Sequence, residues 1–192
     1  YLPQAFTEPR IEELHRIVRE NALGMLVRPA AGGFEADHLP FLLEAAPDGP
    51  GRLIAHVARA NPLWREIGQG DPVLVVFRGV QGYISPNWYP GKHETHRRVP
   101  TWNYEIVHAH GTVHVHDDET FVRGVVARLT RRHEATQPEP WKMGDAPADY
   151  LAEHMGDAPV LVLPCVQGRA KSPAAAAGLL GAILPAAWSF ML

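Results

Sequence analysis

One stretch of the sequence alternates in polarity over its whole length: Tyr104-Glu-Ile-Val-His-Ala-His-Gly-Thr-Val-His-Val-His116. One set of alternate positions is small or apolar, and the other carries four histidines, His108, His110, His114 and His116. Successive side chains of a β-strand point to opposite faces, so this period of two predicts a long strand with one buried face and one polar face.

Shorter apolar runs before and after this segment predict further strands, over residues 22–28, 34–44, 52–57, 73–80 and 160–166. The run 73–80 is nearly continuous and predicts burial on both faces. Pro40 lacks an N–H donor, so its strand should be an edge strand or be broken there. We expect helices from a Thr7 cap to about Asn21, over 62–67, from an Asp117 or Asp118 cap to Ala135, and over 148–155. The strands follow one another like hairpins, which favours an antiparallel barrel with peripheral helices.

The segment 83–104 contains two of the five tryptophans and three of the five tyrosines. It also carries five cationic or titratable side chains, Lys92, His93, His96, Arg97 and Arg98, and three prolines that exclude a continuous helix. Flat rings beside cations suit a flat, aromatic, anionic ligand such as a phosphorylated flavin or nucleotide. A structured loop whose rings plug the rim of a barrel is the alternative.

A second candidate site lies where the strand through His56 turns at Arg59 and enters a helix at Asn61-Pro62. Free amides at a helix N-terminus attract phosphate, and the guanidinium of Arg59 adds a forked donor. A capped turn with a solvated arginine would have the same sequence.

The four strand histidines are spaced so that one face of the strand could present them as metal ligands. Three-histidine metal sites need converging side chains, however, and ligands along one flat strand diverge. We therefore favour a polar sheet face or a subunit contact over a metal site.

The composition sets the frame for these motifs. The 192 residues are enough for one domain with a proper core, and a single cysteine excludes an internal disulfide or a cysteine metal cage. A formal net charge of −3 means that a DNA-binding role would need a local basic patch or a partner.

No secretory signal pattern opens the chain, so we expect a cytoplasmic protein. Residues 172–192 carry no charge, but glycines and prolines interrupt them, which favours a packed or subunit-covering helix over a membrane span.

Several motifs occur in an order that resembles the PaiB-type family of FMN-binding negative transcriptional regulators. They are Tyr1-Leu-Pro-Gln-Ala-Phe6, His38-Leu-Pro-Phe41, His56-Val-Ala-Arg-Ala-Asn-Pro-Leu-Trp64, Tyr83-Ile-Ser-Pro-Asn-Trp-Tyr89, Val99-Pro-Thr-Trp-Asn-Tyr104 and His108-Ala-His-Gly111, followed by Leu129-Thr130 with Glu134 and Pro140-Trp141. The resemblance spans about residues 1–155.

The resemblance implies a split antiparallel β-barrel, here over residues 1–168, with a divergent apolar tail over 169–192. It also implies a homodimer with two FMN sites at the subunit interface. His56, Arg59 and Asn61 would lie at the phosphate of FMN, and His38 beside the isoalloxazine ring. The pocket around the ring and ribityl chain would be formed by Ser85, Trp88, Tyr89, Lys92, Thr101, Trp102 and Asn103.

Two functions remain open at this point. One is a flavin-binding regulator that represses genes, with DNA contact implied only by the resemblance, because no basic recognition helix is visible. The other is a flavin-dependent oxidoreductase whose substrate enters near His38, His93 and His96, since the cofactor itself carries the chemistry. A haem-binding or haem-degrading split barrel is a weaker third possibility.

Overall fold

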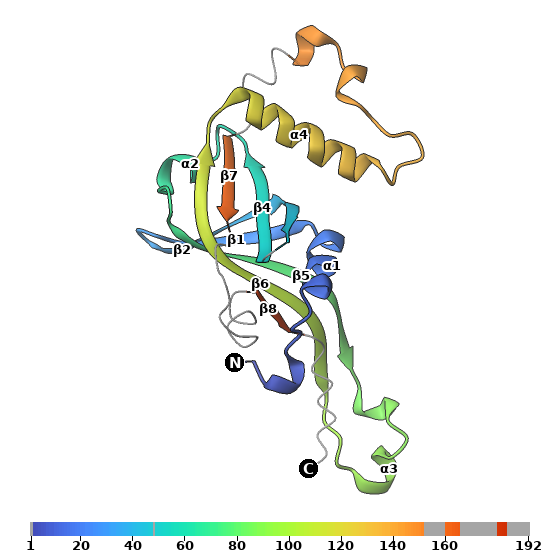
Figure 1. Cartoon of the computed structure of the whole chain (residues 1–192). Helices are drawn as coiled ribbons and strands as arrows, with labels where there is room; N and C mark the ends of the chain where they lie inside the picture. Colours follow the sequence, from blue (N-terminus) through green and yellow to red (C-terminus); the bar gives the residue numbers. More distant parts are fainter. Residues whose placement is uncertain (1, 48, 152–159, 166–179, 184–192) are drawn as a thin grey trace.

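The computed structural model of the chain describes residues 2–47, 49–151, 160–165 and 180–183. Within them, eight strands form one antiparallel sheet, with helices at its ends and edges (Figure 1). The strands are β1 (Leu23–Ala30), β2 (Gly33–Pro40), β3 (Leu42–Ala46), β4 (Gly49–Val57), β5 (Pro72–Ile84), β6 (Thr101–His116), β7 (Val160–Cys165) and β8 (Leu180–Ile183). The helices are α1 (Ile11–Glu20), α2 (Leu63–Glu66), α3 (Lys92–Thr95) and α4 (Glu119–Glu134). The predicted mainly β class is confirmed.

The strand order explains why the sheet curves. It runs β2-β1-β5-β6-β7-β4-β3, and β8 also pairs with β6. The two strands at the ends of this order, β2 and β3, are consecutive in sequence and are separated only by Phe41. The sheet must therefore bend round on itself, and the break that Pro40 predicts is located at this point.

Phe41 lies at the centre of the resulting core. Its side chain is 1% exposed and packs edge-on against Phe77, with ring centroids 5.5 Å apart. A Cβ atom at Gly24 would lie only 2.7 Å from the Phe77 ring and 2.8 Å from the Phe41 ring. Glycine at position 24 therefore lets β1 pass close to the two rings.

The long strand β6 alternates as its sequence predicts, with Val107, Ala109 and Val113 buried. The prediction that residues 73–80 are buried on both faces is wrong for the single chain. Alternate side chains of β5, from Val73 to Phe77, are buried, but Leu74 and Val76 between them are only half-buried. The physical reason is that the core lies on one face of this antiparallel sheet.

A bulge divides the β5–β6 hairpin into two parts. The register shifts between Arg78 and Gln81, so that Gly79 and Val80 face the single residue Glu105. Bulges bend and twist a strand pair. Beyond the bulge the two strands continue as a ribbon that carries residues 85–100 at its far end (Figure 1). We call residues 81–104 the arm.

Helix α1 packs its apolar stripe, Leu14, Ile17 and Val18, into the main core. It begins later than predicted, and the proposed Thr7 cap is wrong: the Thr7 hydroxyl donates instead to the carbonyl of Pro3, 3.4 Å away. The buried carboxylate of Glu8, and not Thr7, accepts the backbone N–H of Arg10 at the start of the helix, at 2.8 Å.

Helix α4 is capped as predicted, since the Asp118 carboxylate accepts the N–H of Phe121 at 2.7 Å. Its buried residues Val122, Val125 and Leu129 form a second core cluster with Ile54 of β4. Of the predicted helix 148–155, residues 148–151 are helical and the rest lies outside the described residues.

In the uncharged tail, residues 172–192, we favoured a helix, and the part that the structure describes is not helical. Its described part is strand β8, whose backbone pairs with Ile106–Ala109 of β6, and the remainder lies outside the described residues. No helix in the described part of the chain is long and apolar enough to cross a membrane.

Candidate functional site

Asn61 organises the turn between β4 and α2. Its side-chain oxygen accepts the N–H of Leu63 at 2.8 Å, and its amide nitrogen donates to Asp37 Oδ1, also at 2.8 Å. Asn61 thus makes a capping bond as predicted, but α2 begins one residue later than predicted, with Pro62 at the N-cap position; the Asp37 bond ties the turn to β2. Because both ends of its side chain are engaged, Asn61 holds the turn in shape and keeps one of its two amide N–H groups for a ligand.

Arg59 lies in the same turn and points its guanidinium at a carboxylate. Nη2 is 2.7 Å from Asp117 Oδ1, and the guanidinium carbon lies 5.9 Å from the centroid of Trp64. The hydrogen bond from Arg59 lowers the pKa of Asp117. The pair is about half exposed, so an anionic ligand can exchange with Asp117 at modest cost.

His56 precedes this turn on β4. Its Nδ1 is buried and has no hydrogen-bond partner among the residues that the structure describes. Burial lowers the pKa of His56, because a desolvated imidazolium is disfavoured. A buried ring nitrogen without a partner is uncommon, and it is suited to a partner from outside the chain.

The arm carries the other group of predicted residues. Trp88 at its tip is 67% exposed, and Trp102 on β6 is 50% exposed. The ring centroids of Trp102 and Tyr83 are 6.2 Å apart. Large exposed rings gathered on one ribbon are an apolar surface that a monomeric protein rarely leaves uncovered.

Polar contacts at the tip fix its shape. The Ser85 hydroxyl accepts the N–H of Asn87 at 3.2 Å, Lys92 donates to the side chain of Asn87, and the Arg98 guanidinium lies 5.3 Å from the Tyr89 ring centroid. These bonds close the turn after β5.

At the base of the tip, Thr101 pairs with Ile84 across the ribbon, and Asn103 pairs with Gly82. The side-chain Oδ1 of Asn103 is buried and has no hydrogen-bond partner within the described part of the chain. It is the second buried polar atom among the predicted residues that lacks one.

The structure does not bring all predicted residues together within one chain. In Figure 1 the β4–α2 turn lies beside the barrel, whereas the tip of the arm lies far from it at the lower end of the molecule. His38 is exposed on β2, near the first of these groups, where its neighbour Asp37 bonds Asn61. The predicted site is thus divided into a turn group, His38, His56, Arg59 and Asn61, and an arm group, Ser85, Trp88, Tyr89, Lys92, Thr101, Trp102 and Asn103.

Sequence reasoning missed two members of the turn group. Asp117 binds Arg59 and Asp37 binds Asn61, and both are distant in sequence from their partners. The only signal for Asp117 is its place beside the cap residue Asp118, which gives no indication of an arginine partner.

The strand histidines do not converge on a metal. Among the described residues, no group of three or more histidine, cysteine, aspartate or glutamate side chains could hold a metal ion. The ring centroids of His108 and His110 are 6.3 Å apart. The pKa of His108 is lowered by burial and, secondarily, by the positive charge of His110.

The curved antiparallel sheet and its long hairpin arm define the split-barrel class of folds. The structure is similar to the flavocytochrome Anf3 from Azotobacter vinelandii, with a TM-score of 0.58, 13% identity, and coverage of 96% of this chain and 82% of that one. The split barrel predicted from sequence is confirmed by this likeness.

Comparison with protein families gives the finer assignment. A family described as "Putative FMN-binding domain" matches residues 1–158. The chain therefore belongs to this FMN-binding family, as its resemblance to the PaiB type predicted, and its cofactor is a flavin.

Two relatives illustrate the family. The chain is 39% identical over 108 residues to an uncharacterized protein of Saccharomyces cerevisiae, covering 56% of this chain and 64% of that protein. It is 37% identical over 111 residues to protease synthase and sporulation protein PAI 2 of Bacillus subtilis, covering 58% of this chain and 51% of that protein. The matches thus span between about half and two thirds of these relatives.

Proposed function

We propose that two copies of this chain form a homodimer that binds FMN at two equivalent sites between the subunits, and that the dimer is a regulatory protein. One observation carries the proposal: the β4–α2 turn of the turn group and the tip of the arm lie far apart within one chain (Figure 1). In a two-fold symmetric pair, the arm of one subunit can reach the turn group of the other, and the same contact then occurs twice.

The turn group fits the phosphate end of FMN. Arg59 would exchange the carboxylate of Asp117 for the phosphate, whose oxygens match the guanidinium fork. The unpartnered Nδ1 of His56 would gain a hydrogen bond, and Asn61 would keep the turn in shape through Leu63 and Asp37.

The arm group fits the ring end. The exposed faces of Trp88 and Trp102 offer stacking surface for a flat heterocycle, and the buried Oδ1 of Asn103 offers an acceptor for a ring N–H. When bound, the flavin supplies reversible electron and hydride chemistry, and the chain supplies binding and orientation.

The outer face of the sheet supports the dimer. Register places Val27, Leu74 and His110 in one row across three strands, and Met25, Val76 and His108 in the next. The four apolar side chains of these rows are only half-buried in the single chain. A second subunit would cover this face, in agreement with the subunit contact that the histidine spacing favoured.

Complementation between two variants tests the shared site. One variant carries Arg59→Ala and Asn61→Ala, and the other carries Trp102→Ala and Asn103→Ala. Each alone should bind FMN poorly, but a mixture that has been dissociated and reassociated should recover tight binding at roughly a quarter of the sites, because half of random dimers are mixed and each holds one intact site. A mixture that binds no better than its components would show that each site lies within one chain.

The regulatory role rests on the family resemblance, and a cytoplasmic location stays a prediction from sequence. A flavin-dependent oxidoreductase remains the competing function. It would be favoured if the FMN-loaded protein oxidised NADPH in many turnovers with an added acceptor, whereas a regulator should not turn over.

A further inference from the structure

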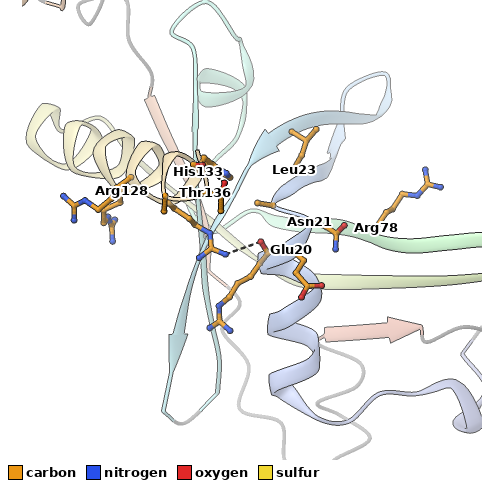
Figure 2. A pocket seen from close by; sticks show the side chains of 12 residues that line it. Glu20, Asn21, Leu23, Arg78, Arg128, His133 and Thr136 are labelled. Carbon is orange, nitrogen blue, oxygen red and sulfur yellow. Dashed lines mark hydrogen bonds between the residues drawn. The ribbon is translucent and has the colours of Figure 1, made fainter. Parts of the chain in front are cut away.

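An open cleft lies between the C-terminal ends of α1 and α4, and none of its lining residues belongs to the turn group or the arm group. Its volume is about 940 Å³. Figure 2 shows that Arg128, His133 and Thr136 come from α4 and the turn after it, Glu20 and Asn21 from the end of α1, Leu23 from β1 and Arg78 from β5. Three separate parts of the fold therefore meet there.

The cleft is strongly cationic in a chain whose formal net charge is −3. Among the residues that the structure describes, its only acidic lining residue is Glu20, which is already paired with Arg16 at 2.5 Å. Five arginines line it, Arg19, Arg78, Arg128, Arg131 and Arg132. Like charges gathered in this way repel one another unless an anion lies between them.

The contacts of these arginines leave much of their donor capacity unused. Arg128 is paired with Glu44, and Arg78 donates to the neutral side chain of Gln81 at 2.7 Å. Within the described residues, Arg19 and Arg131 make no ion pair. Arg132 donates to the carbonyl of Arg19 at 3.2 Å, which is the dashed bond in Figure 2.

Helix capping accounts for only part of the cluster. Cations near a helix C-terminus interact favourably with the helix dipole, and this explains the position of Arg132 against the last turn of α1. It does not explain Arg78, which belongs to β5 and lines the cleft with its guanidinium pointing away from α4 (Figure 2).

The geometry points to a binding site for a small ligand that carries two or more phosphate groups, distinct from the flavin site. Guanidinium forks match phosphate oxygens in pairs, and several arginines along one cleft suit a ligand with several phosphates. A volume of about 940 Å³ is within the range of pockets that hold small organic ligands and exceeds what one inorganic anion fills. Exposed Leu23 adds an apolar wall for the organic part.

Calorimetric titration with inorganic pyrophosphate at physiological salt tests the site, on the purified protein and again after saturation with FMN. Saturable binding that FMN leaves unchanged is expected. Combining Arg19→Ala with Arg131→Ala should weaken pyrophosphate binding by about tenfold or more while the affinity for FMN stays the same. Loss of pyrophosphate binding on FMN saturation would assign it to the flavin site and overturn the proposal.

Arg123→Ala is the matched control, because Arg123 is on α4 outside the cleft and is paired with Glu119 at 2.8 Å. It should leave pyrophosphate binding unchanged. Equal weakening by the control would show general charge attraction, and the proposal would fail. Arginine-dependent binding of a DNA duplex without pyrophosphate binding would instead identify a nucleic-acid contact and overturn it as well. A circular-dichroism melt confirms that each variant is folded.

Discussion

Arg59 and Asp117 are 58 residues apart in sequence, yet Nη2 of Arg59 lies 2.7 Å from Oδ1 of Asp117. The contact joins the turn after β4 to the residue before the cap of α4. Arg59 is the cation that we assign to the FMN phosphate, so the chain's own carboxylate holds that cation before the phosphate arrives. Anion binding at this turn is then a competition between Asp117 and the ligand.

Asp117→Asn should raise the affinity for FMN roughly two- to fivefold, because it removes the competing half of an exposed ion pair and a like charge beside the phosphate. Riboflavin has no phosphate, and its affinity should not change. Flavin-fluorescence titration measures both. Asp118→Ala is a useful comparison, since it removes the cap of α4 and should lower stability by ~1 kcal/mol without altering the preference for FMN. Unchanged FMN affinity in Asp117→Asn would place the phosphate elsewhere.

Arg59→Ala combined with Asn61→Ala should lower FMN affinity by more than about tenfold, through loss of the guanidinium fork and of the contacts that hold the turn. The loss should be much smaller for riboflavin. The same titration measures both ligands. A dissociation constant for FMN equal to that of the unaltered protein contradicts the assignment of these residues.

Folding stability should fall as the pH drops below about 6.5, the ordinary pKa of histidine. Burial lowers the pKa of His56 in the folded chain, so the unfolded chain takes up a proton first and gains stability as the pH falls. His108 acts in the same direction. The contribution of these buried neutral histidines to the free energy of unfolding is therefore complete above the pKa that they have in the unfolded chain. It is lost as the pH falls from there to the lower pKa that they have in the folded chain.

Urea unfolding midpoints at pH 7.5 and pH 5.5, compared between the unaltered protein and His56→Gln, measure this effect. Glutamine does not titrate, so the variant should lose less stability between the two pH values. His93→Gln, on the exposed tip of the arm, is the control and should leave the difference unchanged. If His56→Gln keeps the full pH dependence, burial of His56 is not its cause.

Gly24→Ala should destabilise the fold by about 1–3 kcal/mol, because the added methyl group meets the Phe77 and Phe41 rings at 2.7 and 2.8 Å. Gly124→Ala on α4 is the matched substitution, since a Cβ there meets nothing within 4 Å. It should be neutral or stabilise by roughly 0.5–1 kcal/mol, as alanine does in helices. Thermal or urea unfolding distinguishes the two. Equal effects would mean that β1 moves aside at no cost.

Local sequence patterns predicted most of the elements because their causes are local. The alternation along β6, the Asp118 cap and the apolar stripe of α1 depend on residues a few positions apart, and the structure has all three. The wrong predictions concern what neighbouring elements do. The Thr7 cap failed because Glu8 takes the N–H of Arg10, and the burial of β5 failed because one of its faces lacks a covering layer within the chain.

The sequence by itself determined the strand pattern, the break beside Pro40, the kinds of side chain in the candidate site and the family. Only the tertiary structure decided that the β4–α2 turn and the tip of the arm lie far apart in one chain, that Asp117 holds Arg59, and that five arginines line one cleft. The physical reason is range. Period, capping and proline effects act within a few residues, whereas an ion pair across 58 residues or a cleft between two helices depends on how the whole sheet bends at Phe41.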